Sequence, residues 1–136
     1  MAQQPIELIL ARQFADHLAT PMIVIDAEGT SVFWNEPFER YTGLRFDEMG
    51  RVPKEMWVKG LSAVDDDGIE IPRHLLPPVI ALEEHRPAFM RSRVSLFDTG
   101  SSDVVMGAFP LLGQTDRFIG VVVLFWRDDE MPEELP

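Results

Sequence analysis

The chain of 136 residues contains no cysteine. That absence excludes disulfide bonds, thiolate catalysis, cysteine-ligated iron–sulfur clusters and the usual structural zinc sites. Basic residues are also scarce, because 12 lysines and arginines stand against 23 aspartates and glutamates, which gives a formal net charge of −11. Such a chain repels phosphate backbones and anionic lipid surfaces, so we expect neither nucleic acid nor a membrane as a partner.

Long hydrophobic runs are absent as well. The longest clean apolar run, from Gly120 to Trp126, is far shorter than the ~20 residues needed to span a bilayer. The first residues carry Glu7 and Arg12 among their apolar positions and lack a basic leader, unlike a secretory signal. We therefore predict a cytoplasmic protein.

The sequence also lacks the short motifs of common enzyme classes. It contains no G-x-S-x-G elbow, no phosphate-binding P-loop and no dinucleotide-binding glycine fingerprint. Because acyl, phosphoryl and hydride transfer have no visible machinery, we predict that the protein is not an enzyme. The composition of 46% hydrophobic and 26% charged residues is typical of a folded domain and not of a disordered chain.

The most informative stretch begins with two short apolar segments separated by a turn. Met22 to Ile25 are apolar and mostly branched, and Ser31 to Trp34 form the second segment. Between them lie Asp26 and Gly29, residue types that favour a reversal of the chain. This pattern predicts a β-hairpin.

A capped helix is predicted immediately after the hairpin. Asn35 can accept hydrogen bonds from the first free amides of a helix, and Pro37 fits the first helical turn. Phe38 and Tyr41 share one helical face, and Gly43 supplies the left-handed residue that often ends a helix.

The hairpin and helix together resemble the opening of a PAS domain. Asn35, Phe38 and Gly43 match the family pattern N-x-x-F-x-x-x-x-G, and Asp26 and Gly29 match the turn before it. The resemblance implies an α+β fold, in which a five-stranded antiparallel sheet carries short helices on one face. It also implies a sensory or regulatory module of signal transduction, because PAS domains usually sense a signal inside the cleft between the sheet and these helices. Asp26, Gly29, Asn35 and Gly43 form the structural signature of this prediction.

The segment before the hairpin, residues 1–19, is predicted to form an amphipathic helix. Its apolar residues recur at steps of three and four between Pro5 and Pro21, and they are Ile6, Ile9, Leu10, Phe14 and Leu18. The stripe of Ile6, Leu10 and Phe14 can cover either the chain's own sheet or the matching helix of a second copy. Because such helices often pair in PAS proteins, we predict a homodimer through this stripe.

The remainder divides into a PAS domain, residues 20–127, and an acidic disordered tail, residues 128–136. Within the domain, residues 44–63 are predicted to form short helices or turns, and a Pro-led helix runs from Leu76 to Glu83. Alternating apolar residues and turn residues then predict three closing strands, at residues 90–97, 104–111 and 118–126.

The resemblance places apolar side chains of the helices against the last strands, where they line a cleft. The predicted lining residues are Phe38, Met49, Trp57, Leu76, Val79, Ile80, Met106, Phe109, Val121 and Val123. Because no cluster of charges lies among them, we predict a small apolar ligand, such as a fatty acid or an aromatic compound. A second hypothesis is a ligand-free dimeric scaffold, whose own side chains fill the cleft and which acts by contacting a signalling protein.

One segment, Phe97 to Ser102 with the sequence FDTGSS, is similar to the catalytic loop of aspartic proteases. That chemistry needs two carboxylates that share a proton, so Asp98 would have to pair with Asp98 of a second copy. Too few residues follow Asp98 for the further strands and helix of such an enzyme. In a PAS domain the same segment is a polar turn between two strands.

No cofactor or metal is expected. Some PAS proteins bind haem through a histidine of the connecting helix, near which His74 and His85 lie. Light-sensing flavin members form their photoadduct on a cysteine, which this chain lacks. Haem and flavin nevertheless stay open as alternatives. The adjacent carboxylates Asp65, Asp66 and Asp67 lack the alternating ligand spacing of a calcium-binding loop.

Overall fold

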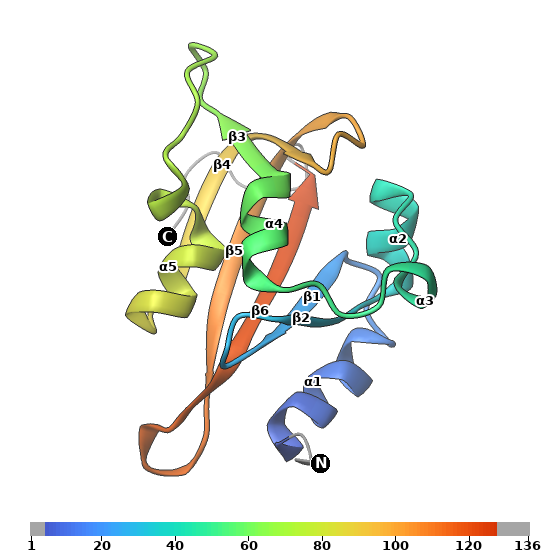
Figure 1. Ribbon diagram of the computed structural model, residues 1–136, viewed down its shortest axis with the longest axis vertical. Helices are drawn as coiled ribbons and strands as arrows, with labels where there is room; N and C mark the ends of the chain where they lie inside the picture. Colours follow the sequence, from blue (N-terminus) through green and yellow to red (C-terminus); the bar gives the residue numbers. More distant parts are fainter. Residues whose placement is uncertain (1–4, 128–136) are drawn as a thin grey trace.

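The computed structural model describes residues 5–127. In chain order the elements are α1 (Ile6–Ala15), β1 (Met22–Asp26), β2 (Ser31–Trp34), α2 (Glu36–Thr42), α3 (Phe46–Met49), α4 (Lys54–Gly60), β3 (Leu61–Val64), η1 (Arg73–Leu75), α5 (Pro77–Glu84), β4 (Ala88–Leu96), β5 (Ser101–Leu112), η2 (Gln114–Asp116) and β6 (Phe118–Arg127). Within these residues, six strands form one antiparallel sheet in the order β2-β1-β6-β5-β4-β3 (Figure 1). The predicted α+β fold is therefore confirmed.

The β1–β2 hairpin forms where the sequence predicts it. The Asp26 side chain accepts hydrogen bonds from the backbone N–H groups of Glu28 and Thr30, each at 3.0 Å, and so closes the turn. Gly29 has a φ of 95°, and a Cβ atom there would lie 3.0 Å from the Leu82 side chain. The turn thus requires glycine both for its backbone conformation and for its close approach to α5.

The helix α2 has the predicted caps. The Asn35 side chain accepts a hydrogen bond from the backbone N–H of Phe38 at 3.1 Å, and Pro37 lies in the first turn. Gly43 ends the helix with a φ of 79°. The hairpin and α2 are therefore specified almost entirely by local sequence.

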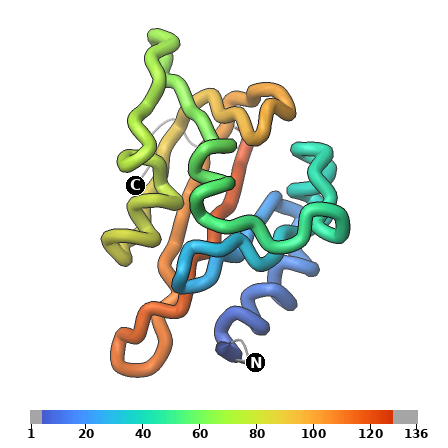
Figure 2. Tube along the Cα trace, in the orientation of Figure 1, coloured from blue at the N-terminus to red at the C-terminus, as the bar shows by residue number. Residues whose placement is uncertain are grey.

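The two ends of the domain meet in the middle of the sheet. Strand β1 pairs with β6 over five residues, with Val24 opposite Val122, and β6 pairs in turn with β5. Figure 2 shows the blue hairpin beside the red last strand, although they lie about a hundred positions apart in the chain. The predicted closure of the early hairpin by the terminal strands is confirmed.

The described part of the chain has one strand more than the five predicted. Residues 61–64 belong to the stretch for which only short helices or turns were predicted, yet they form β3. They pair with β4, with Leu61 opposite Leu96 and Ala63 opposite Val94. A four-residue segment with two small side chains carries almost no local strand signal, so this pairing depends on the distant strand.

Helices cover both faces of the sheet, and the alternation along β1 separates the two layers. Ile23 and Ile25 face the larger core beneath α2 to α5, whereas Met22 and Val24 face α1. The helix α1 packs on the second face through buried residues that include Leu8 and Ala15. The short helices α2 to α5 thus share one face, as predicted, and the N-terminal helix lies on the other.

Candidate functional site

A small cavity of about 40 Å³ lies between the sheet and the helices of the larger core. It opens beneath α4, and residues from both halves of the domain line it: Ile23, Ile25, Ser31, Trp34, Phe38, Leu44, Val52, Trp57, Leu61, Pro78, Leu96, Phe97, Val123 and Phe125. All but Ser31 are hydrophobic or aromatic. Such an apolar recess with one polar group has the composition of a small-molecule site.

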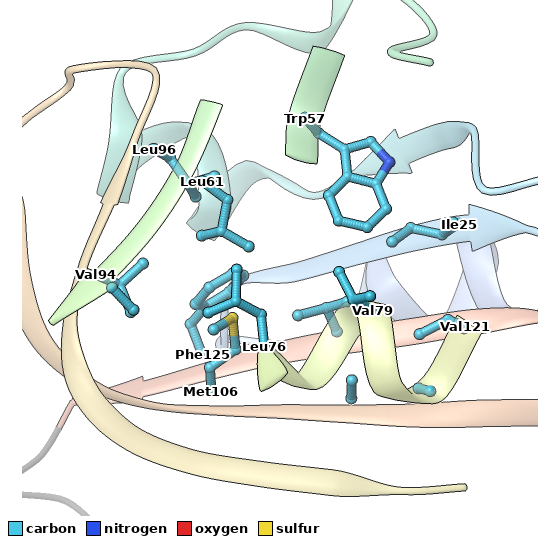
Figure 3. Close-up of a cluster of buried hydrophobic side chains, with 14 of the residues drawn as sticks. Ile25, Trp57, Leu61, Leu76, Val79, Val94, Leu96, Met106, Val121 and Phe125 are labelled. Atoms are coloured by element: carbon cyan, nitrogen blue, oxygen red, sulfur yellow. The ribbon is translucent and has the colours of Figure 1, made fainter. Parts of the chain in front are cut away.

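Two tryptophans shape the cavity, and backbone carbonyls fix both of their rings. The Trp57 indole reaches from α4 toward the sheet, beside Ile25 (Figure 3), and its Nε1–H donates to the carbonyl oxygen of Gly29 at 2.7 Å. The Trp34 Nε1–H donates to the carbonyl oxygen of Leu44 at 3.2 Å. Because both N–H groups have partners elsewhere, the rings present only carbon to the cavity.

Phe97 forms one wall from an unusual backbone position. It has a φ of 48° in the turn between β4 and β5, a conformation that is rare for a bulky side chain. Its backbone N–H donates to the carbonyl oxygen of Gly60 at 2.7 Å. A Cβ atom on Gly60 would lie 2.5 Å from the Phe97 ring, so only glycine at this position leaves room for the ring.

The same turn decides the structural role of the FDTGSS segment. Phe97 and Asp98 are its two central residues, both with positive φ, and the Thr99 N–H donates to the carbonyl oxygen of Leu96 at 2.9 Å. This is the geometry of a tight hairpin turn. The Asp98 side chain is exposed at its tip, so the segment acts in this fold as a chain reversal.

The structure brings together only part of the predicted lining. Phe38, Trp57 and Val123 line the cavity. The following residues belong to the same core but lie beside the cavity, Met49 being only partly buried: Met49, Leu76, Val79, Met106 and Val121. Figure 3 shows Leu76, Val79, Met106 and Val121 within this cluster.

Two predicted lining residues lie elsewhere, which corrects the sequence-based set. Phe109 packs edge-on against Phe89, with ring centroids 5.2 Å apart, on the opposite face of the sheet from Met106. Residues three apart on a strand face opposite sides, so these two could not share one cleft. Ile80 follows Val79 on α5, where each residue turns about 100° around the axis, and it is not part of the core cluster.

The sequence-based set missed the other lining residues, which are Ile23, Ile25, Ser31, Trp34, Leu44, Val52, Leu61, Pro78, Leu96, Phe97 and Phe125. Alternation within the hairpin could have found Ile25, since Ile23 and Ile25 share a face. No local signal marks Val52 or Phe97, because the former bridges to β2 and the latter depends on its turn conformation.

Shifted pKa values occur away from the cavity. Burial raises the pKa of the Tyr41 hydroxyl, and its hydrogen bond with Ser102 partly offsets that shift. Hydrogen bonds from Arg45 and Arg93 lower the pKa values of Asp47 and Asp103, respectively, in exposed pairs. These shifts mark surface ion pairs and a half-buried phenol, and they do not identify a catalytic group.

The described residues show neither a metal site nor a membrane-spanning helix. Among residues 5–127 no group of three histidine, aspartate or glutamate side chains could hold a metal ion, and no helix is long and apolar enough to cross a membrane. His85 stacks on Phe118 at 3.9 Å, and neither His85 nor His74 lines the cavity. Neither histidine is therefore placed as an axial haem ligand in the cavity, and the lining holds no cysteine for a flavin photoadduct.

Comparisons with known proteins agree with this architecture. The family model described as PAS fold matches residues 10–51, whereas no curated protein matches the sequence significantly. The fold resembles the PAS domain of BvgS from Bordetella pertussis at 17% identity and a TM-score of 0.59, covering 89% of this chain and 84% of that one. It also resembles a LOV protein from Rhodobacter sphaeroides, at 16% identity and a TM-score of 0.68. That match covers 96% of this chain and 72% of the LOV protein chain.

A third similar structure is the PAS domain of nitrogen regulation protein NR(II) from Vibrio parahaemolyticus, at 12% identity and a TM-score of 0.58. The match covers 87% of this chain and 97% of that domain. The sequence match lies over the hairpin and α2, and the structural likeness extends over nearly the whole chain. Together with the signature residues, these findings show that the chain has the PAS fold.

Proposed function

We propose that this protein is a sensory module of signal transduction that binds a small apolar molecule in the cavity beneath α4. The observation that carries the proposal is the almost entirely apolar lining of that recess, drawn from β1, β2, β6 and the helices above them. The similar PAS domains of BvgS and of nitrogen regulation protein NR(II), and the LOV protein, support a sensory role.

Ligand binding would act by shifting the packing of helices on the sheet. The helix α4 is tied to the hairpin by the Trp57–Gly29 hydrogen bond, and Asn35 directly follows β2. The Asn35 amide donates to the carbonyl oxygens of Ala15, at the end of α1, and of Thr20. A ligand that favours one packing would therefore bias the position of α1, provided that it binds that packing more tightly.

The surface that we propose to carry the signal is the outer side of α1. Leu8 and Ala15 face the sheet, whereas Ile6, Leu10 and Phe14 lie on the other side and are 66%, 55% and 59% exposed. A helix that is apolar on both sides can pack on its own sheet and on a second copy at once. We propose a homodimer through this stripe, with the dimer presenting a surface to a signalling protein.

The double substitution Leu10→Asp and Phe14→Asp tests the dimer. We expect light scattering to give the mass of a dimer for the wild type and of a monomer for the variant, because facing carboxylates repel in an apolar interface. The matched control is Met56→Asp with Leu75→Asp, which adds the same charge at similarly exposed apolar residues elsewhere. A monomeric wild type, or an unchanged mass in the variant, would contradict the proposal.

The second candidate function is a ligand-free scaffold. The observation in its favour is the cavity volume of about 40 Å³, which is well below the usual 300 Å³ or more of ligand sites. Native mass spectrometry of freshly purified protein separates the two functions. A co-purifying small mass supports sensing, and its repeated absence supports the scaffold.

We propose no enzymatic role. The Asp98 side chain lies at an exposed hairpin tip and not beside a second carboxylate in a cleft. Incubation with denatured proteins at acidic pH tests this directly, and cleavage that disappears in Asp98→Asn would contradict it.

A further inference from the structure

Ser31 is the one polar side chain among the residues that line the cavity, and its hydroxyl is unpaired. The residue is 4% exposed, and its Oγ atom has no hydrogen-bond partner among residues 5–127. The backbone of Ser31 is already satisfied, because its N–H donates to the carbonyl oxygen of Val52 at 2.8 Å and its carbonyl accepts from the Val52 N–H at 3.0 Å. The hydroxyl is therefore not needed to hold β2 in place.

The sheet register shows the direction of this hydroxyl. Ser31 lies directly opposite Ile25 on the neighbouring strand, and residues directly opposite one another in an antiparallel pair project from the same face. Ile25 faces the larger core and lines the cavity. Ser31 consequently projects from the face of the sheet on which the recess lies, and it is one of the residues that line the recess.

An unpaired hydroxyl in an apolar recess calls for a partner. Burying a hydroxyl without a hydrogen bond costs free energy, so native proteins seldom leave such groups unsatisfied. The two indole N–H groups at the cavity already donate to backbone carbonyls. A molecule in the cavity would therefore find a single fixed polar side-chain contact, the Ser31 hydroxyl, which can both donate and accept.

We infer that Ser31 anchors a small neutral ligand that carries one hydroxyl group on an otherwise apolar body, such as a phenol or a short alcohol. This inference rests on the proposed ligand-binding function and names the ligand class. No charged side chain of the described part of the chain lines the recess, so a carboxylate or a phosphate would find no counter-ion there. A fatty acid is disfavoured for the same reason.

The cavity volume sets the size of this ligand. At about 40 Å³ the recess is smaller than the roughly 150 Å³ of a cavity that admits benzene, so even a single ring enters only if a wall of the recess moves outward. The wall best placed to yield is Phe97, which is half-buried and held at a φ of 48° in a surface turn. Leaving that backbone conformation would relieve strain and move the ring outward.

The chain supplies a matched control for Ser31. Ser92 is likewise buried, at 7% exposure, with an unpaired Oγ atom, but it does not line this cavity. Replacing either serine with alanine removes one unpaired buried hydroxyl. Only the change at Ser31 alters the proposed anchor.

The test compares phenol with benzene by isothermal titration calorimetry on wild type, Ser31→Ala and Ser92→Ala. We expect the preference for phenol, expressed as the ratio of the two dissociation constants, to fall at least tenfold in Ser31→Ala and to stay unchanged in Ser92→Ala. Ser31→Cys keeps the approximate size of the side chain but forms weaker hydrogen bonds, so it should give an intermediate ratio. It replaces Ser31→Ala in the test if the alanine variant fails to fold.

The outcomes separate the inference from the proposed function. If both compounds bind but their ratio is the same in wild type, Ser31→Ala and Ser31→Cys, the anchor is disproved while the apolar site stands. If neither compound binds the wild type, both the anchor and the proposed ligand-binding function are overturned.

Discussion

Replacing Asn35 with alanine should lower the free energy of unfolding by about 3–5 kcal/mol, the range for breaking a buried hydrogen-bond network. The side chain is 1% exposed and makes four hydrogen bonds to the backbone. Its oxygen accepts from the N–H groups of Met22 and Phe38, and its amide donates to the carbonyl oxygens of Ala15 and Thr20. Alanine would leave all four groups without that partner. Urea unfolding measures the loss.

The matched control for Asn35→Ala is Asp65→Ala. The Asp65 side chain also accepts from two backbone N–H groups, those of Asp67 and Ile69, but it does so in an exposed turn. Water can replace it there, so we expect a loss below about 1 kcal/mol. Equal losses in the two variants would show that Asn35 does not join α1, β1 and α2.

Replacing Trp57 with alanine should also lower the free energy of unfolding by about 3–5 kcal/mol, the usual cost of truncating a buried aromatic residue. The change removes the largest side chain of α4 from the core and widens the cavity. We expect the variant to bind benzene more tightly than the wild type does. Benzene at 100 times its dissociation constant should then restore about 2.7 kcal/mol, which thermal unfolding can measure.

Trp57→Phe provides the graded comparison. It keeps an aromatic ring in the cavity wall but removes the N–H that donates to Gly29, so we expect a loss of about 1–2 kcal/mol and little gain in benzene affinity. If Trp57→Ala costs no more than Trp57→Phe, or if benzene fails to stabilise it, the cleft is not the apolar site that we describe.

The sequence predicted the hairpin and α2 well because their determinants are local. Asp26, Gly29, Asn35 and Gly43 each act on backbone groups within a few positions, and the structure contains those turns and caps. The same locality explains the failures. Strand β3 depends on pairing with β4, which follows more than twenty residues later. A short segment of small residues carries no local pattern that predicts such a pairing.

The candidate site was harder to predict because it depends on which way side chains face. Met106 and Phe109 were placed in one cleft, although the alternation of a strand separates them. Ser31 was passed over as the first residue of a strand, and only its register opposite Ile25 and its unpaired hydroxyl reveal it. Phe97 lines the cavity because its turn adopts a conformation that its residue type disfavours.

The prediction for the acidic tail, residues 128–136, lies outside the described residues.

The proposed dimer and the ligand depend on different parts of the fold, namely the outer side of α1 and the cavity on the opposite face of the sheet. Asn35 connects them, because it follows β2, caps α2 and donates to the carbonyl oxygen of Ala15 at the end of α1. A module in which a cleft controls a distant helix needs such a connection.

The most direct measurement is a titration of isotope-labelled wild-type protein with phenol, followed by the indole N–H signals in nitrogen–proton NMR spectra. Trp34 and Trp57 line the cavity, whereas Trp126 does not, so the chain contains its own reference. We predict saturable shifts of the Trp34 and Trp57 signals, with the backbone amides at the end of α1 moving at the same concentrations and Trp126 unmoved. Phenol that shifts neither cavity tryptophan, or Trp126 alone, would contradict a ligand-sensing cleft coupled to α1.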